Sequence, residues 1–168
     1  ISNKTIKQAN TITYNPVIYE LSKENKELIP KTIKHIFIIS DRRERIETLR
    51  KIAKAVNSDK TMIFINTKYD LEESLQKLQY HNYNVAALAG NIDKQSKKKA
   101  VEDFQNGRLQ YLLATDVAAR GLQIDHVSTV INVNLPEEPT EYLHRAGRCG
   151  RNNEQGLCIS IITENELN

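Results

Sequence analysis

The sequence predicts an α/β domain with a doubly wound, mostly parallel sheet and helices on both faces. Its apolar strand segments are continuous runs rather than alternating ones, which is typical of strands buried on both sides. Segments with apolar residues at helical spacing separate these runs. Strand and helix patterns therefore alternate along the chain. Ligands on such sheets bind beyond the carboxyl ends of the strands, so polar residues in those places are the first candidates for a site.

Length and composition fit one globular domain. The chain has 168 residues, of which 27% are charged and 39% hydrophobic. A net charge of +3 is too small to indicate a nucleic-acid binder by itself, so local clusters must carry that argument. Cys149 and Cys158 lack metal-ligand spacing, and no apolar run reaches membrane-spanning length. We therefore expect a reduced, cytoplasmic protein with no metal site of its own and no membrane partner.

The chain divides into a polar leading segment and one domain. Residues 1–30 are expected to be a connecting segment with one short strand at residues 16–19. Asp41, with Glu44 three residues later, resembles a capping box at the start of the first helix. Strands are expected at residues 33–39, 62–65, 85–88, 111–114, 129–133 and 157–162. Helical stripes are expected at residues 46–56, 71–78 and 93–106, with Asn66-Thr67 capping the second.

Three arginines at steps of three stand out in the sequence HRAGRCGR at residues 144–151. They are Arg145, Arg148 and Arg151. On a helix that ends near Gly147 or Gly150, this spacing would stack the guanidinium groups on roughly one side. Always-charged planar forks aimed at one place suit a phosphate. The alternative is a helix end whose cations complement the dipole, closed by a glycine cap. Three arginines interleaved with two glycines favour the anion site.

A second candidate follows the strand at residues 111–114. Thr115 and Asp116 could hydrogen-bond a backbone or a phosphate, and Gly121 permits close approach or a positive φ. An alternative explains this segment at least as well. Thr115 or Asp116 would cap a strand-to-helix turn, and Arg120 would pair with Asp116 or Asp125.

Lys97 is a third candidate, among four lysines near a helix start. It precedes Ala100, Val101 and Phe104 by three, four and seven residues, which places it on the buried stripe. A cation at a helix N-terminus is unfavourable with the dipole, and an anionic partner would offset that cost. This favours a phosphate ligand for Lys97, whereas the other lysines fit a solvated face.

Other chemistry is poorly supported. His144 and Cys149 have no companions at metal-ligand spacing, and Cys149 has no visible base. Cys149 is either a small filler, the favoured reading, or a thiol that oxidation could block. The sequence contains no GxxxxGK[ST] loop, so this chain does not hold a whole triphosphate by itself.

Taken together and in this order, these segments resemble the second RecA-like domain of DEAD-box RNA helicases, from about residue 33 to residue 163. The segments that look like motifs IV, IVa, V and VI are residues 62–68, 90–107, 114–121 and 144–151. Motif I and the DEAD box belong to the first domain of that family and are absent here. The resemblance implies that residues 1–30 are an interdomain linker or the tail of the first domain, and that residues 31–168 are the helicase C-terminal domain.

The resemblance also implies roles for individual residues. Arg148 and Arg151 would reach the γ-phosphate of ATP, the second as arginine finger. The implied ATP-binding residues are Gly121, Gln123, Arg148 and Arg151. The implied RNA-binding residues are Thr67, Gly90, Lys97, Thr115 and Asp116, through contacts to the RNA backbone that carry no sequence information. The implied interdomain coupling residues are Arg120, His144 and Arg145. Mg²⁺ would be held mainly by the absent first domain.

Two departures from the family pattern concern ligand contacts. Gln123 stands where the family usually has an Asp that binds the ATP ribose, and so loses the charge. Residues 89–91 read Ala-Gly-Asn in place of His-Gly-Asp, and Lys97 replaces an arginine and its bidentate fork. We expect RNA binding to persist in weaker form.

The expected function is the second motor domain of an ATP-dependent RNA helicase, inactive and monomeric as an isolated piece. RNA-stimulated ATP hydrolysis would belong to the full-length protein. Two alternatives stay open. The chain could be domain 2 of another superfamily 2 helicase or translocase, or a non-catalytic RNA- or protein-binding module with the same fold.

Overall fold

The computed structural model describes residues 30–89, 92–151 and 154–166. Residues 1–29 of the predicted linker, with the strand expected at residues 16–19, and the RNA-binding candidate Gly90 lie outside the described residues. Within the described part, no helix is long and apolar enough to cross a membrane.

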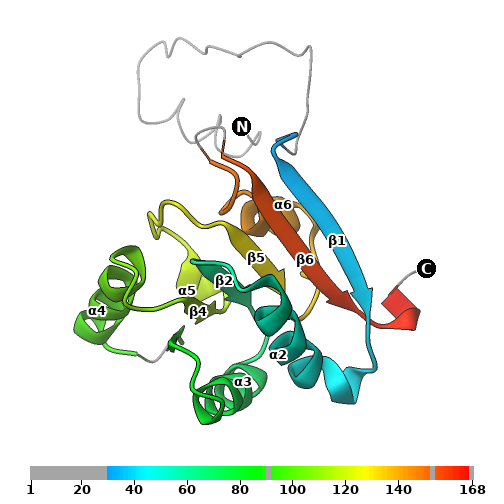
Figure 1. Ribbon diagram of the computed structural model, residues 1–168, viewed down its shortest axis with the longest axis horizontal. Helices are drawn as coiled ribbons and strands as arrows, with labels where there is room; N and C mark the ends of the chain where they lie inside the picture. The colour runs from blue at the N-terminus through cyan, green and yellow to red at the C-terminus, as the bar shows by residue number, and fades with distance from the viewer. Residues whose placement is uncertain (1–29, 90–91, 152–153, 167–168) are drawn as a thin grey trace, which may run out of the picture.

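The core of the fold is a six-stranded sheet in the order β1-β6-β5-β2-β4-β3 (Figure 1). Every pairing between neighbours is parallel, so the sheet is wholly and not just mostly parallel. The strands are β1 (Ile33–Ile39), β2 (Thr61–Phe64), β3 (Val85–Leu88), β4 (Tyr111–Ala114), β5 (Thr129–Asn132) and β6 (Gly156–Ile162). Each lies within one residue of its predicted bounds, because a continuous apolar run is hard to place anywhere but in a doubly covered sheet.

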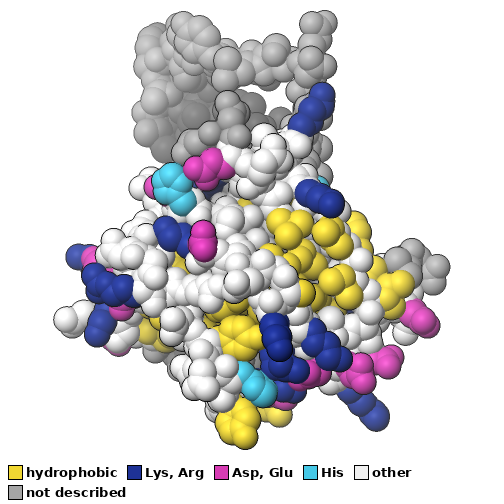
Figure 2. All heavy atoms as spheres, viewed as in Figure 1, with side chains coloured by type: hydrophobic (Ala, Val, Ile, Leu, Met, Phe, Trp, Pro, Cys, Tyr) yellow, Lys and Arg dark blue, Asp and Glu magenta, His cyan; other side chains and the backbone are white. Residues whose placement is uncertain are grey.

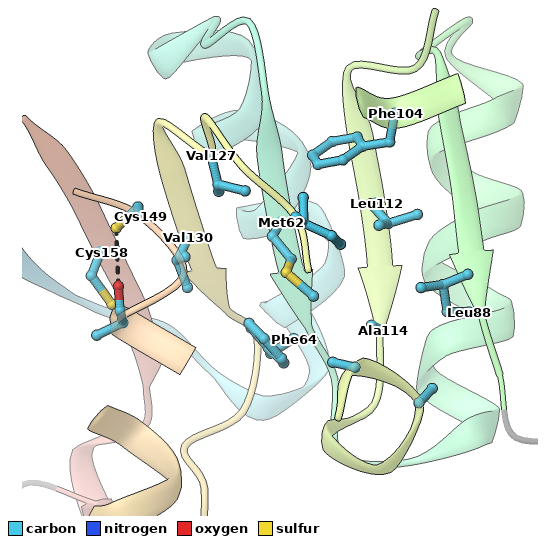
Figure 3. Packing of buried hydrophobic residues seen from close by; sticks show 14 of the residues in the cluster. Met62, Phe64, Leu88, Phe104, Leu112, Ala114, Val127, Val130, Cys149 and Cys158 are labelled. Atoms are coloured by element: carbon cyan, nitrogen blue, oxygen red, sulfur yellow. Dashed lines mark hydrogen bonds between the residues drawn. The ribbon is translucent and has the colours of Figure 1, made fainter. Parts of the chain in front are cut away.

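Helices cover both faces of the sheet, as the sequence predicts. The helices α2 (Arg45–Val56) and α3 (Lys68–Tyr80) pack on one face, and α4 (Lys94–Gln105), α5 (Asp116–Ala119) and α6 (Pro139–Ala146) pack on the other. Met62 and Phe64 of β2 lie on the same side of the sheet as Phe104, in the core beneath the second group of helices (Figure 3). Ile63 and Ile65 point toward the first group. Alternate residues of one strand thus supply two cores.

The topology places a ligand crevice beside β2. After β2 the chain builds β3 and β4 on one side, and then crosses to build β5 and β6 on the other. A parallel sheet binds ligands where the strand order reverses in this way, at the carboxyl ends. Here that point lies between the ends of β2 and β5.

The predicted capping box at Asp41 is wrong. The Asp41 side chain makes no capping hydrogen bond, and a short 3-10 turn, η1 (Arg42–Glu44), precedes α2. The backbone closes this turn, since the amide of Glu44 donates to the carbonyl of Asp41 at 2.9 Å. The cap at Thr67 is confirmed, because its hydroxyl accepts a hydrogen bond from the amide of Asp70 at 3.1 Å.

β1 is an edge strand that keeps much of its apolar surface exposed. Phe37 and Ile39 are 55% and 56% exposed. On the opposite face, hydrophobic side chains also lie at the surface over β1 and β6 (Figure 2). Helix burial therefore contributes less to holding β1 than it does for the central strands. Its seven residues pair with β6 in register from Ile33 opposite Gly156 to Ile39 opposite Ile162.

We expect Phe104→Ala to lower the free energy of unfolding by about 3–5 kcal/mol, because it opens a cavity beneath α4. Phe104 is fully buried and is the residue through which α4 enters the core. Urea denaturation of the chain measures this change. Tyr80→Ala is the control, since Tyr80 is 83% exposed and its removal should change stability by less than about 0.5 kcal/mol. Equal effects of the two substitutions would contradict the packing described here.

Candidate nucleotide and RNA interface

Three segments that follow the carboxyl ends of strands meet one helix at the crevice. Asn66 follows β2, Asp116 follows β4, Asn134 follows β5, and Arg145 lies in the last turn of α6. The four residues are distant in sequence and come together because parallel strands end at the same edge. Three of the segments that carry them are those that look like motifs IV, V and VI.

Arg145 is the centre of this meeting point. Its side chain is only 1% exposed. The Nε and Nη2 groups donate to the two carboxylate oxygens of Asp116 at 2.8 and 2.5 Å. Nη1 donates to the carbonyl of Asn134, and Nη2 to the amide oxygen of Asn66, both at 2.8 Å. The guanidinium also lies 5.1 Å from the centre of the Phe64 ring. A buried guanidinium is tolerated when its donors are met in this way.

The prediction that three guanidinium groups stack on one side is wrong. α6 ends at Ala146 with Gly147 as its C-cap, so Arg148 and Arg151 follow the helix. Arg145 points inward to Asp116, whereas the other two remain nearer the surface. The acidic partner of Arg145 comes from another strand, and the arginine spacing contains no information about it.

Arg148 is half-buried and uses backbone acceptors. Its Nη1 donates to the carbonyl of Leu122 at 2.7 Å, and its Nη2 to the carbonyl of Ala119 at 3.5 Å. Burial lowers the pKa of Arg148 from its ordinary value, and the nearby Arg151 guanidinium lowers it further. Both causes disfavour the positive charge, so an anion placed beside Arg148 would be stabilised.

Arg151 is exposed and loosely held. Its Nε donates to the carbonyl of Gly147 at 3.0 Å, and its Nη1 lies 3.9 Å from a carboxylate oxygen of Asp125. The side chains of Arg151 and Asp125 are 40% and 63% exposed. A solvated pair at this distance contributes little energy, so the guanidinium can leave it for a stronger anion.

These segments line a pocket of about 270 Å³. It is lined by Phe64, Asp116, Ala119, Arg120, Gly121, Glu141, His144, Arg145 and Arg148. Gly121 has a φ of +73°, the left-handed region predicted for a glycine at this turn. Gln123 is exposed nearby, and its backbone carbonyl accepts a hydrogen bond from Gln105.

Arg120 does not pair with either predicted acid. Its Nη2 instead donates to Glu141 of α6 at 3.0 Å, across the mouth of the pocket. Asp116 is engaged by Arg145, and Asp125 faces Arg151. The pair links the α5 segment to α6 at the surface, with Arg120 71% exposed.

The RNA-binding candidates divide between two positions on the carboxyl edge. Thr115 is confirmed as the cap of α5, because its hydroxyl accepts from the amide of Ala118 at 3.3 Å. Lys97 is half-buried, and its Nζ donates to the carbonyl of Ala118 at 2.7 Å, so α4 and α5 converge there. Thr67 caps α3 beyond β2, the strand that pairs with β4. Their contact with RNA stays a prediction.

Cys149 fits the filler reading. It is 1% exposed, and burial raises the pKa of its thiol to about 12. The thiol donates to the carbonyl of Ala146 at 3.2 Å (Figure 3). In the part of the chain that the structure describes, no group of three or more His, Cys, Asp or Glu residues could hold a metal ion.

The sequence reasoning missed the polar residues that receive Arg145. The sequence pattern predicts Asn66 only as part of a cap and does not indicate Asn134. The available signal is their position, since each lies two residues after the end of a buried strand, at the carboxyl edge. Glu141, the partner of Arg120, was also missed because it lies on a helix that the spacing did not connect to α5.

Comparison with known proteins identifies the family. The model of the helicase conserved C-terminal domain matches residues 44–153. The chain belongs to this family. The DEAD-box helicase CshC of Bacillus cereus is 34% identical over 159 residues, which cover 94% of this chain and 40% of the relative. The RNA helicase DBP3 of Saccharomyces cerevisiae is 35% identical over 163 residues, covering 94% of this chain and 31% of the relative.

Solved structures agree with the sequence relatives. The C-terminal domain of the DEAD-box protein Dbp5 superposes with a TM-score of 0.74 at 29% identity, covering 79% of this chain and 78% of that one. S. cerevisiae Dbp5 bound to RNA and ADP BeF3 gives a TM-score of 0.79 at 26% identity, covering 98% and 43%. The resemblance to the second RecA-like domain of DEAD-box helicases is thus confirmed. The chain spans 40% of the length of CshC and 31% of the length of DBP3.

We expect Asp116→Asn to destabilise the domain by about 3–5 kcal/mol, because it leaves the Arg145 charge buried without a counter-ion. Urea denaturation tests this. Glu141→Gln removes the acid of the exposed pair with Arg120 and should cost less than about 1 kcal/mol. If both changes cost the same small amount, Arg145 does not depend on Asp116.

The Cys149 thiol should resist modification in the native domain. At pH 8, a pKa of about 12 leaves roughly one thiol in ten thousand ionised, and the thiolate is the reactive form. In a Cys158→Ala background, the disulfide reagent dithiobis(nitrobenzoate) should react slowly with Cys149 in the native chain. It should react fast in about 6 M guanidinium, which unfolds most domains. Rapid native reaction would favour the oxidation-sensitive reading.

Proposed function

We propose that this chain is the second motor domain of an ATP-dependent RNA helicase, which supplies Arg148 and Arg151 to ATP bound across the cleft to the first domain. One observation carries the proposal. The buried Arg145 fixes the end of α6, and two further arginines follow that end. Among the described residues, their one carboxylate contact is the solvated Asp125, 3.9 Å from Arg151. Such an arrangement is poised for an external anion.

In phosphoryl transfer, negative charge spreads over the transferring group, and preformed cations stabilise it. Arg148 is held against backbone carbonyls and would act as a fixed contact. Arg151 is exposed and would swing from Asp125 to the γ-phosphate as the finger. Gly121 would let the backbone approach the nucleotide, and Gln123 would contact the ribose without a charge. Mg²⁺ would be held mainly by the first domain.

RNA would lie along the carboxyl edge beyond β2, β4 and β3. Thr67 and Thr115 cap helices there, and the remaining first-turn amides of the two helices would donate to a backbone phosphate. Lys97 adds a cation beside α5. Dbp5, to which this chain is similar, has been solved bound to RNA. Contacts of this type bind any sequence.

A second candidate is a non-catalytic binding module with the same fold. Gln123 supports this candidate, since the family's usual Asp, whose carboxylate binds the ATP ribose, is replaced here by an uncharged side chain. The intact arginine pair beyond α6 favours the motor domain, because a module without nucleotide has no use for it.

The decisive test is Arg151→Lys in the full-length protein. We expect RNA-stimulated kcat for ATP hydrolysis to fall by about 10³-fold, since lysine keeps the charge and loses the planar fork. RNA binding without nucleotide should be unchanged. Arg108→Lys is the matched control. Arg108 follows the end of α4, is 68% exposed and pairs with Asp103 of that helix. The 168-residue chain alone should show no ATPase.

Unchanged hydrolysis in Arg151→Lys would favour the binding module. ATPase of the isolated chain would contradict the division of labour between two domains. Stimulation by DNA instead of RNA would favour another superfamily 2 motor.

A further inference from the structure

A chain of polar side chains runs from the edge strand β1 to Arg145. It starts at His35, whose Nδ1 shares a hydrogen bond of 2.7 Å with the hydroxyl of Tyr142 on α6. The two rings also lie side by side, with centroids 5.7 Å apart. Burial lowers the pKa of His35, so the neutral ring is the form that meets the tyrosine.

The chain continues beneath α6. The thiol of Cys158 donates to the Tyr142 hydroxyl at 3.8 Å, and the amide of Asn132 donates to Cys158 at 3.6 Å and to Ser160 at 3.0 Å. The amide oxygen of Asn132 in turn accepts from Nη1 of Arg145 at 3.5 Å. Cys158 of β6 and Asn132 of β5 thus link Tyr142 to Arg145, and His35 of β1 holds the outer end of the path.

Tyr142 and Arg145 stand three residues apart, so they project from the same face of α6. α6 has only eight residues and would not be stable alone. Its position depends on side chains that tie it to the sheet. Among the described residues, Arg145 provides a buried tie to the strand ends near the C-terminal end of α6, whereas the exposed pair of Glu141 with Arg120 contributes little energy. Tyr142 provides a second tie to the sheet, one turn earlier.

We infer that Tyr142, held by His35, is a positioning residue that fixes the orientation of α6 and thereby the placement of Arg148 and Arg151. This inference rests on the proposed function. The two arginines begin two residues after α6 ends, so a small rotation of the helix moves both guanidinium groups. A misplacement of about 1 Å can cost up to about 10²-fold in rate. Neither His35 nor Tyr142 would touch ATP or RNA.

The test is Tyr142→Phe in the full-length protein, which removes one hydroxyl and keeps the ring. We expect kcat for RNA-stimulated ATP hydrolysis to fall about tenfold, with KM for RNA unchanged, because the predicted RNA contacts lie on other elements. Tyr111→Phe is the matched control. Tyr111 is 1% exposed and its hydroxyl donates to the carbonyl of Ala53 on the opposite face of the sheet. Loss of the Tyr111 hydroxyl should lower the free energy of unfolding about as much as Tyr142→Phe does, and should leave kcat unchanged.

His35 gives an independent readout. His35→Leu should lower kcat as Tyr142→Phe does, and the double variant should be no worse than either single one. His35→Gln should restore most of the rate, since an amide can share a hydrogen bond with the tyrosine hydroxyl.

The outcomes separate the two ideas. If Arg151→Lys is inactive but Tyr142→Phe keeps wild-type kcat, positioning is wrong while the proposed function stands. Equal loss of kcat in Tyr142→Phe and Tyr111→Phe, or additive effects of His35→Leu and Tyr142→Phe, would also overturn positioning. If the wild-type protein shows no RNA-stimulated hydrolysis, the proposed function fails first.

Discussion

The pairing of Arg145 with Asp116 is the constraint on which the rest of the site depends. Removing two charges from water costs roughly several kcal/mol of free energy per ion. This cost is offset only if the hydrogen-bond donors of the guanidinium find acceptors. Here the carboxylate takes two of them, while Asn66 and Asn134 take others. The ends of β2, β4 and β5 must therefore stay in one arrangement around α6. A neutral substitute would fill the space without imposing that arrangement.

The same constraint separates three arginines of identical chemistry. The one inside the helix meets a carboxylate from a neighbouring loop and becomes structural. Among the described residues, Arg148 and Arg151 meet mainly backbone carbonyls, and their one acidic contact is the solvated Asp125, 3.9 Å from Arg151. Their charge remains available to a ligand because Asp116 is already occupied by Arg145. Arg148 and Arg151 can bind an external anion because the Asp116 carboxylate binds Arg145.

Most of the fold was predictable from sequence, whereas the inner part of the site was not. Burial on both faces leaves a local signature, and β1, β3 and β4 have the predicted bounds. The direction of Arg145 depends instead on Asp116 and Asn66, which lie 29 and 79 residues away. Spacing along one segment cannot encode such partners. At Asp41 a local rule failed because the backbone carbonyl closes the turn that the carboxylate was expected to cap.

The edge strand connects these observations. β1 contacts the segment from Tyr142 to Arg151 at two places. His35 meets Tyr142 at the start of this segment, and Ile33 lies against Gly150 near its end. Gly150 has a φ of +67°, and a Cβ there would lie 2.6 Å from the Ile33 side chain, so a larger residue would push the turn away from the sheet. The segment from α6 to Arg151 is thus pinned at both ends by one strand. The register of β1 against β6 therefore matters to the site although Phe37 and Ile39 of β1 are exposed, because any slip of β1 would carry the arginines with it.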